Sequence, residues 1–270
     1  GQLDKYTADT KFIHIDIDPA EIDKNVASSL GLAGDMKKIL SILMQRSSYK
    51  SLADWWTKIS EWQEEFAYDY NVPKLTLPWA LHHVAQATVG KKFAFATDVG
   101  QHQMWAIQHF HYSYPGQLLT SGGFGTMGFG LGAAIGAKVG NPDKEVLHIT
   151  GDGGFRMNCN ELCTEEHYGL KIITILFNNG TLGMVRQWQT LIYNKHYSQT
   201  TLDRGPDFVK LAEAYGLNGF RAKTEKEFEK ALKAALASEK GSVIDCIVDI
   251  DEMVRPMVPA GERITHFIVD

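Results

Sequence analysis

Short apolar runs and amphipathic stretches alternate along most of the chain. Apolar runs that predict buried strands lie near residues 92–98, 117–121, 144–150, 171–177, 217–222 and 242–249. Stretches with helical spacing lie near residues 78–89, 125–139, 156–168, 182–194, 206–215 and 225–238. Alternation of strands and helices with short connections is typical of a parallel sheet covered on both faces. The pattern therefore predicts an α/β fold, doubly wound around a mostly parallel six-stranded sheet.

The chain before this region has a different pattern. A strand is expected over residues 11–16, a helix over 35–45 and an amphipathic, Trp-rich helix over 53–70. The polar run Ser47–Ser51 between the two helices predicts a linker. We therefore expect four parts, which are an α/β remnant over 1–50, a linker and helix over 51–77, the sheet domain over 78–250 and a C-terminal tail over 251–270.

Two polar motifs follow neighbouring predicted strands. Gly151-Asp152-Gly153 ends the run over 144–150, and Asn178-Asn179 ends the run over 171–177. Open α/β sheets bind ligands at the carboxyl ends of their strands, and carboxylate and carboxamide oxygens suit Mg²⁺ held against a phosphate. Glycines beside Asp152 allow a diphosphate to approach the backbone. We place Asp152 on a strand-end loop, and for this residue alone a helix N-cap is the alternative.

Two further loops are expected at the same edge of the sheet. The glycine-rich run Ser121–Gly132 follows one predicted strand, and Asp98–Trp105 follows another. For Gly130, Gly132 and Gly136 the alternative is close helix packing, and for His102 it is a solvated loop histidine. Several polar or glycine-rich loops on one sheet edge favour a single ligand site.

Composition narrows the function classes only loosely. Hydrophobic residues make up 44% of the chain and charged residues 22%, which is ordinary for a globular protein. A net charge of −5 without a basic run gives no reason to expect nucleic acid or a membrane surface as a partner. The three cysteines predict neither a disulfide framework nor a zinc site. Because the chain opens on Gly1 within a pattern, we expect it to be a piece of a longer protein.

Five segments together resemble the C-terminal part of the acetohydroxyacid synthase (acetolactate synthase) catalytic subunit, a thiamine diphosphate (ThDP) enzyme. These are Asp98–Trp105, Ser121–Gly128, the GDG and NN motifs, Leu182–Gln189 and Pro256–Pro259. The GDG and NN pair indicates only a ThDP enzyme, and the run Gly-Met-Val-Arg-Gln-Trp-Gln narrows the resemblance to this synthase. The opening His14–Glu21 with Gly34-Asp35 resembles the end of that family's central FAD-binding domain. From about residue 78 onward the chain resembles its diphosphate-binding domain.

The resemblance implies a role for several residues. The Mg²⁺ ligands would be Asp152, the side chain of Asn179 and the backbone carbonyl of Thr181. ThDP would be contacted by Gln101, His102, Gly153 and Gly154 at the diphosphate, by the carbonyl of Gly125 at the aminopyrimidine, by Met127 as a wedge beneath the bent cofactor, and by Met184. The substrate pocket would be lined by Met184 and Trp188, and FAD would be touched by Asp16, Ile17 and Asp35. A core position is the alternative for Met127 and Trp188, and an ordinary cap is the alternative for the two aspartates.

The resemblance also implies an activity. A transferase of this family decarboxylates pyruvate and joins it to pyruvate or 2-ketobutyrate, giving 2-acetolactate or 2-aceto-2-hydroxybutyrate for branched-chain amino acid biosynthesis. ThDP, Mg²⁺ and FAD would be the cofactors, and the setting a homodimer or larger assembly in the bacterial cytoplasm rather than a plastid, with a possible regulatory small subunit. The glutamate that activates the pyrimidine belongs to an N-terminal domain on the neighbouring subunit. No segment here resembles that domain, so no catalytic residue is assigned and the isolated chain is expected to be incomplete.

Three alternatives stay open. The first is another ThDP-dependent decarboxylase or carboligase, such as glyoxylate carboligase or a pyruvate oxidase. The second is a catalytically incomplete cofactor-binding fragment. The third is a non-catalytic nucleotide-binding or assembly module with a Rossmann-like sheet. The sequence Gly100-Gln-His-Gln after the first sheet strand lacks a G-x-G-x-x-G fingerprint, which argues against the third.

Overall fold

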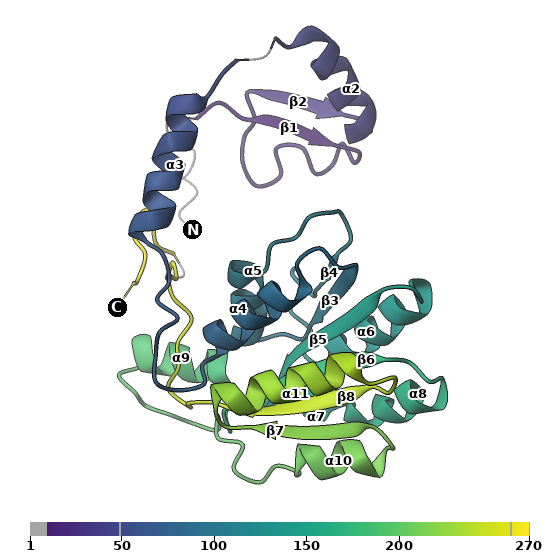
Figure 1. Ribbon diagram of the computed structural model, residues 1–270. Helices are drawn as coiled ribbons and strands as arrows, with labels where there is room; N and C mark the ends of the chain where they lie inside the picture. Colours follow the sequence, from purple (N-terminus) through teal and green to yellow (C-terminus); the bar gives the residue numbers. More distant parts are fainter. Residues whose placement is uncertain (1–9, 49, 260, 270) are drawn as a thin grey trace. The chain divides into compact units, whose positions relative to one another are not determined.

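The computed structural model describes residues 10–48, 50–259 and 261–269, and the chain divides into two compact units. The larger unit covers residues 69–254, and the smaller is formed by residues up to 68 with those from 255 onward (Figure 1). The predicted sheet domain over 78–250 therefore lies within the larger unit. In the described part of the chain, none of the helices has the length and apolar character needed to cross a membrane.

The larger unit is built on one six-stranded sheet in the order β4-β3-β5-β6-β8-β7 (Figure 1). Its strands are β3 (Phe93–Thr97), β4 (Leu118–Leu119), β5 (Glu145–Gly151), β6 (Ile172–Asn178), β7 (Asn218–Ala222) and β8 (Ser242–Ile247). All of the strand pairs in this sheet are parallel. The predicted α/β fold and its six-stranded parallel sheet are thus confirmed.

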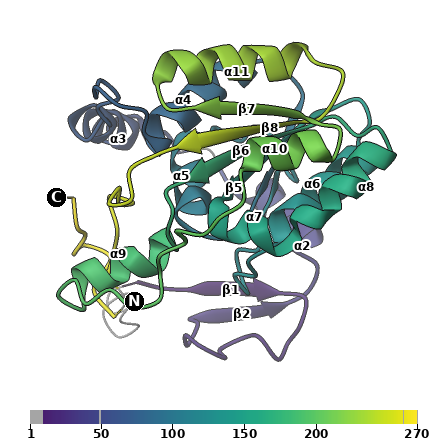
Figure 2. The ribbon, with the colours of Figure 1, turned by 90° about the horizontal axis from the view of Figure 1, so that it is seen from below.

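Helices cover both faces of this sheet (Figures 1 and 2). One face carries α4 (Leu77–Thr88), α5 (Gln101–His109) and α11 (Glu225–Ala237), and the other carries α6 (Phe129–Gly140), α7 (Asp152–Asn158), α8 (Leu162–His167) and α10 (Phe208–Ala214). Alternate residues of one strand supply the two cores, because successive side chains point to opposite faces. In β5, Leu147 and Ile149 pack on the face that carries α4, α5 and α11, and Val146 packs on the face that carries α6. The fold is therefore doubly wound, as predicted.

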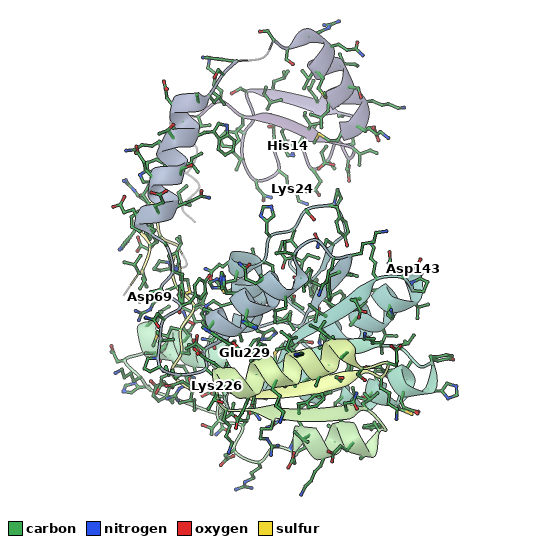
Figure 3. The ribbon with its side chains drawn as sticks, viewed as in Figure 1. His14, Lys24, Asp69, Asp143, Lys226 and Glu229 are labelled. Carbon is green, nitrogen blue, oxygen red and sulfur yellow. The ribbon has the colours of Figure 1, made fainter. Side chains whose placement is uncertain are left out.

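Helix α11 shows how the sequence pattern produces one of these layers. Phe228, Leu232 and Ala235 are buried against the sheet, whereas Lys226 and Glu229 are exposed on the outer side (Figure 3). The helix begins with a capping box in which the Thr224 side chain and that of Glu227 satisfy each other's backbone amides. The helical spacing of apolar positions therefore predicts both the helix and its buried face.

Two predicted elements differ in the structure near the sheet edge. Residues 101–109 form helix α5 instead of a polar loop, and His102 is buried, so the solvated-loop alternative is wrong. Helix α6 begins at Phe129 rather than near 125, because Gly125 and Gly128 have φ values of 69° and 87° that a helix does not accept.

The helix predicted over 156–168 is also different. It begins earlier, at Asp152, and is split into α7 and α8 by a 3₁₀ turn, η1 (Cys159–Glu161). Asp152 is therefore the first residue of a helix and not part of a strand-end loop. Gly151 occupies the N-cap position, so the N-cap alternative for Asp152 is wrong as well. The reason is that β5 runs directly into α7 without an intervening loop.

The smaller unit contains a parallel pair of strands, β1 (Ile13–Asp16) and β2 (Leu30–Ala33). Helices α2 (Met36–Arg46) and α3 (Ala53–Glu65) follow, close to the predicted bounds except that α3 ends earlier. Strand β2 is not predicted, because its four residues include a glycine and no clear alternation. The chain from residue 255 onward also belongs to the smaller unit, and its described residues contain one isolated bridge, between Met257 and Ile268. Tyr49 of the predicted linker and Ala260 and Asp270 of the predicted tail lie outside the described residues.

One carboxylate is buried in the fold away from the sheet's carboxyl edge. The side chain of Glu165 in α8 is 1% exposed. Burial raises its pKa to about 8, and the nearby backbone of Ile172 opposes this only partly. A group whose folded pKa exceeds its unfolded value stabilises the fold at low pH, and this contribution is lost as pH rises through the folded pKa.

We expect Glu165→Gln to flatten the pH dependence of stability between about pH 4.5 and 8. The variant and the parent should be similarly stable near pH 4.5, while near pH 8 the variant should be the more stable by an amount on the order of several kcal/mol. Urea unfolding of both proteins across this range measures the difference. Parallel stability curves for the two proteins would show that Glu165 does not titrate in this way.

Candidate functional site

A cavity of about 340 Å³ opens at the carboxyl ends of β3, β5 and β6. Strands β4 and β5 lie on opposite sides of β3, so the order in which successive strands are added to the sheet reverses at β3. Such a switch point is where open α/β sheets bind ligands. The cavity is lined by the start of α5, the glycine loop before α6, the start of α7, and the segment from Asn179 into α9 (Gly183–Leu191). All residues expected to hold ThDP or Mg²⁺ line it, which are Gln101, His102, Gly125, Met127, Asp152, Gly153, Gly154, Asn179, Thr181 and Met184.

Asp152 brings an unpartnered carboxylate oxygen to this cavity. Its side chain is 1% exposed, and Oδ2 has no hydrogen-bond partner among the described residues. Burial raises the pKa of the carboxyl to about 6, although the charge of Arg156 and backbone hydrogen bonds with Gly153 and Gly180 act in the opposite direction. A buried carboxylate is costly unless it is paired or binds a metal, so this oxygen is suited to a cation.

The turn after β6 supplies neutral oxygen atoms nearby. Asn179 Oδ1 accepts a hydrogen bond from the backbone amide of Thr181 at 3.2 Å. Within the described part of the chain, no three His, Cys, Asp or Glu side chains gather as metal ligands. A cation at Asp152 would therefore be completed by amide and carbonyl oxygens, which hard cations accept.

His102 presents a second unpartnered polar atom. The ring is buried, and its Nε2 has no hydrogen-bond partner among the described residues. It lies against two glycines, since a Cβ built on Gly100 or on Gly151 would approach the ring to 2.9 Å or 3.1 Å respectively. Burial lowers the pKa of His102 to about 4, so the ring is neutral at pH 7 in the ligand-free chain.

Gln101 is held by a network that the sequence did not reveal. Its Nε2 donates to Gln187 Oε1 at 2.8 Å and to the backbone carbonyl of Glu252 at 2.9 Å. Gln187 lies on α9 and exchanges two hydrogen bonds with the backbone of Val254, at 2.9 Å and 3.0 Å. The network connects the cavity wall to the segment after β8. The sequence signals this network only weakly, by an amide side chain at Gln187 on the helix face between Met184 and Leu191.

Asp98 is a second residue near the cavity whose contacts the sequence did not predict, although it lies within a noted motif. Its carboxylate accepts hydrogen bonds from the backbone amides of Gly128 and Gly130 at 3.0–3.1 Å. From the other side, Asn158 Nδ2 donates to the carbonyl of Gly128 at 2.7 Å. Asp98 and Asn158 therefore fix the glycine loop that carries Gly125 to the cavity.

Gly153 of the GDG motif and the adjacent Gly154 serve close packing within the protein. A Cβ on Gly154 would meet the Asp98 carboxylate at 2.2 Å, and one on Gly153 would meet the Leu182 side chain at 2.8 Å. The sequence predicted only close approach of a diphosphate to these positions. The structure adds that Gly154 allows α7 to lie against Asp98.

The close-packing alternative for the glycines of α6 is confirmed for one residue only. A Cβ on Gly130 would approach the backbone nitrogen of Asp98 to 2.7 Å and His148 Nε2 to 2.5 Å. A Cβ on Gly132 or Gly136 would meet no atom of the described residues within 4 Å, so close packing is wrong for these two. Only Gly130 faces the end of β3.

The residues expected at the substrate pocket are not brought together. Met184 lines the cavity and packs against the larger core. Trp188, one turn further along α9, instead lines a separate hollow with Ile192 and Tyr193. Val185 borders both hollows, so the two spaces adjoin along α9.

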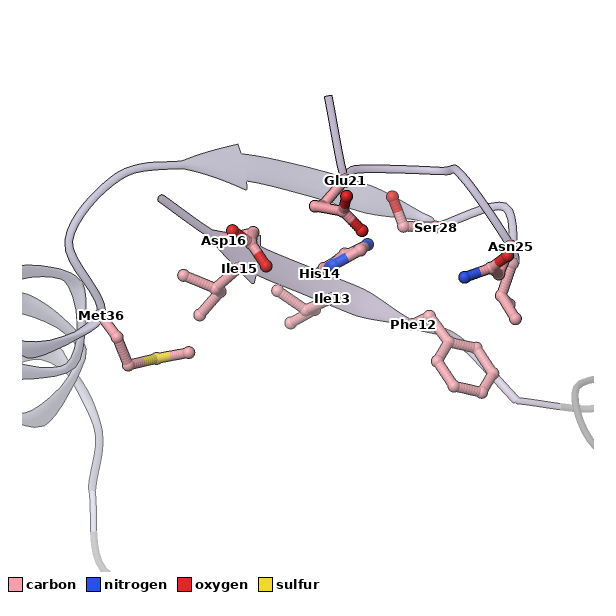
Figure 4. A pocket seen from close by; sticks show the side chains of 10 residues that line it. Phe12, Ile13, His14, Ile15, Asp16, Glu21, Asn25, Ser28 and Met36 are labelled. Atoms are coloured by element: carbon pink, nitrogen blue, oxygen red, sulfur yellow. The ribbon is translucent and has the colours of Figure 1, made fainter. Parts of the chain in front are cut away.

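The residues expected to touch FAD lie in the smaller unit. Asp16 lines a hollow of about 490 Å³ beside β1, together with His14 and Glu21 (Figure 4). Asp35 caps α2 by accepting a hydrogen bond from the backbone amide of Lys38 at 2.9 Å. Ile17 is 75% exposed and does not line this hollow. The capping alternative therefore describes what Asp35 does in the structure, and only Asp16 of the three lines the hollow.

Comparison with known proteins supports the interpretation of the larger unit. Residues 98–246 match the family model described as thiamine pyrophosphate enzyme, C-terminal TPP binding domain. The chain is 39% identical over 278 residues to the acetolactate synthase large subunit of Haemophilus influenzae, covering 100% of this chain and 48% of that protein. It is 41% identical over 275 residues to the acetolactate synthase of Mycobacterium leprae, covering 97% and 44%. It is 37% identical over 286 residues to the probable acetolactate synthase large subunit of Methanococcus aeolicus, covering 99% and 48%. The chain thus spans about half the length of the curated relatives it matches.

Proposed function

Since the chain belongs to the thiamine pyrophosphate enzyme family through its C-terminal TPP binding domain, we propose that it forms the diphosphate-binding part of an acetolactate synthase. The reaction would decarboxylate pyruvate and join it to pyruvate or 2-ketobutyrate, giving 2-acetolactate or 2-aceto-2-hydroxybutyrate. The observation that carries the proposal is the unpartnered Asp152 Oδ2 in a cavity at the sheet's switch point. The likeness to acetolactate synthases over nearly all of this chain supports the choice of substrates.

In this proposal Mg²⁺ is held by Asp152, the side chain of Asn179 and the backbone carbonyl of Thr181. The donor set fits the cation, because it is made of hard oxygen atoms and one of them is a buried carboxylate that lacks a partner. Burial supports tight binding, since charges attract more strongly where water is excluded. The same burial lets a proton compete with the metal below about pH 6, where the carboxyl takes up its proton in the metal-free chain.

The remaining cavity residues would bind and orient ThDP. When bound, ThDP supplies the electron sink that makes loss of CO₂ from a 2-oxo acid possible. Gln101 and His102, with the backbone at Gly153 and Gly154, would contact the diphosphate. The carbonyl of Gly125 would accept a hydrogen bond from the aminopyrimidine, and Met127 and Met184 would pack against the cofactor. The rigid Asp98–glycine loop contact suits this orienting task.

Other parts of the proposal concern the whole assembly. The pyrimidine-activating glutamate would come from a pyrimidine-binding domain on another subunit, in a homodimer or larger cytoplasmic assembly with a regulatory small subunit. FAD would be bound beside Asp16 in the smaller unit. Trp188 would act from the neighbouring hollow along α9, where a 2-oxo acid could pass Val185 on its way to the cavity.

Product analysis tests the proposed activity. The chain, supplied with the pyrimidine-binding and central domains of a related synthase, is incubated with pyruvate alone and with pyruvate plus 2-ketobutyrate. We expect 2-acetolactate in the first case and mainly 2-aceto-2-hydroxybutyrate in the second. Acetaldehyde as the main product would instead favour another ThDP decarboxylase or carboligase. The same conclusion would follow from acetyl phosphate when inorganic phosphate and oxygen are supplied, or from tartronate semialdehyde in a parallel incubation with glyoxylate.

Gly183 gives a prediction for cofactor binding that does not alter a ligand atom. A Cβ at this position would approach Gln101 Oε1 to 2.0 Å and Asn179 Nδ2 to 2.8 Å. We expect Gly183→Ala to displace both side chains and to weaken Mg²⁺-dependent ThDP binding on the order of tenfold or more, the effect typical of disturbing the surroundings of a metal site. Calorimetric titration measures the change, with Gly132→Ala as a matched glycine control. Unchanged affinity in Gly183→Ala would contradict the roles given to Gln101 and Asn179.

A further inference from the structure

Arg156 lies close to both segments that carry the proposed metal ligands, which are helix α7 with Asp152 and the turn after β6 with Asn179 and Thr181. It lies one helical turn after Asp152 on α7, so the two side chains share a face of the helix. Its Nη2 donates a hydrogen bond to the backbone carbonyl of Leu202 at 3.0 Å. Its guanidinium also lies 5.9 Å from the centre of the Phe208 ring, a cation–π contact. The guanidinium of Arg156 is therefore held by a backbone carbonyl and by an aromatic ring.

Residues 200–202, which we name the strap, are in turn bonded to the turn after β6. Leu202 N donates to the carbonyl of Gly180 at 2.7 Å, and Leu182 N donates to the carbonyl of Thr200 at 2.8 Å. Thr181 Oγ1 also donates to the carbonyl of Thr200 at 2.9 Å. The strap therefore holds the turn that carries Asn179 and Thr181, and Arg156 holds the strap.

The strap also contacts the first arm of the site. A Cβ on Gly153, next to Asp152, would approach the Leu202 side chain to 3.4 Å. Gly205, just beyond the strap, leaves room for Arg156, since a Cβ there would meet Nη2 at 2.2 Å. The path from the Asp152 helix to the Asn179 turn is thus a short series of fixed contacts.

We propose that Arg156 is a positioning residue that sets the distance between Asp152 and the turn carrying Asn179 and Thr181, and so tunes the affinity for the cation. This inference rests on the proposed function, because it takes these three residues as the metal ligands. The role depends on the donated hydrogen bond. A lysine should therefore replace arginine in part, whereas a methionine of similar length should not.

The test uses Mn²⁺ as a probe for the Mg²⁺ site, with ThDP present, and electron paramagnetic resonance to count free Mn²⁺, a method that also detects weak binding. In the full chain we expect Arg156→Met to raise the Kd for Mn²⁺ on the order of tenfold, as loss of a charge-assisted hydrogen bond predicts. Arg156→Lys should recover most of the affinity. Gly205→Ala should act like Arg156→Met, because it displaces the guanidinium but keeps its charge. Arg204→Met, which removes an exposed charge close to the strap, is the control and should leave the Kd unchanged.

Two further readouts separate positioning from a general loss of stability. Amide hydrogen exchange at Leu182 and Leu202 should accelerate in Arg156→Met, while the thermal midpoint of the metal-free chain stays close to that of the parent. Equal Mn²⁺ affinity in Arg156→Met and the parent would overturn this inference and leave the proposed function intact. Absence of ThDP-dependent Mn²⁺ binding in the parent itself would overturn the proposed function, and this inference with it.

Discussion

Asp152→Ala is expected to abolish Mg²⁺-dependent ThDP binding while the chain keeps a cooperative fold. The loss should exceed about 100-fold, beyond the 10–100-fold that residues around a metal ligand typically contribute. The fold should survive, because the buried carboxyl has a pKa raised to about 6. A raised pKa means that the group favours the folded state at low pH and that this contribution is lost as pH rises past 6. At pH 7 the metal-free variant should therefore be at least as stable as the parent.

Two matched variants sharpen this result. Asp152→Asn should be nearly as damaging as alanine, because a neutral amide gives up most of the attraction for a divalent cation. Asn179→Ala should weaken binding less, because it removes a neutral ligand. The measurement is calorimetric titration of ThDP at saturating Mg²⁺ into the chain supplied with the missing domains of a related synthase. Binding by Asp152→Ala as tight as that of the parent would show that the cavity is not the cofactor site.

The second large effect concerns stability and compares glycines of one helix. Gly130→Ala should destabilise the fold by roughly 2–4 kcal/mol, because its Cβ would collide with the backbone of Asp98 and with the buried His148, which cannot move away freely. Gly132→Ala and Gly136→Ala should instead stabilise it by about 0.5–1 kcal/mol, since alanine is the better helix former and open space surrounds both positions.

Urea unfolding of the three variants measures this contrast. Because all three changes add one methyl group to α6, differences in helix propensity cancel and only the surroundings differ. Similar stability in all three would mean that Gly130 is not pressed against the end of β3. The Asp98 contact to the glycine loop would then need another explanation.

The sequence could predict those features that depend on local pattern and on the general rules of parallel sheets. The apolar runs over 144–150 and 171–177 correspond to β5 and β6, and the motifs that end them meet at one cavity. Convergence of separate loops follows from the parallel arrangement alone, because it places all strand ends on one edge. This is why the loops could be expected at one site, whereas the role of each residue in them came from the resemblance to a known family.

Features that depend on distant partners could not be predicted. Helix α5 was not predicted because its first residues, Gln101 and His102, are polar and line the cavity. Trp105 is the first buried apolar residue of this helix, so no helical spacing of apolar positions is visible before it. The bonds of Asp98 to Gly128 and of Gln101 to Gln187 connect segments far apart in the chain. No local spacing shows which buried polar groups will meet.

The same limit applies to side chains whose surroundings lie across an element. Sequence pattern does not distinguish Gly130 from Gly132, although one faces a strand end and the other faces open space. Trp188 shares a helix face with Met184, yet Met184 lines the cavity and Trp188 lines the neighbouring hollow. In each case the sequence shows the type of residue, but it does not show which distant residues will surround the side chain.

Titration with ThDP, with and without Mg²⁺, and with NAD, of the chain supplied with the missing domains of a related synthase, tests the central claim most directly. We expect heat of binding from ThDP only when Mg²⁺ is present, no binding of NAD, and loss of the ThDP signal when EDTA is added. Binding of NAD in preference to ThDP would instead favour a Rossmann-like nucleotide-binding module. ThDP binding of equal strength in Mg²⁺ and in EDTA would contradict the assignment of Asp152, Asn179 and Thr181 as the ligands that hold the cofactor through its metal.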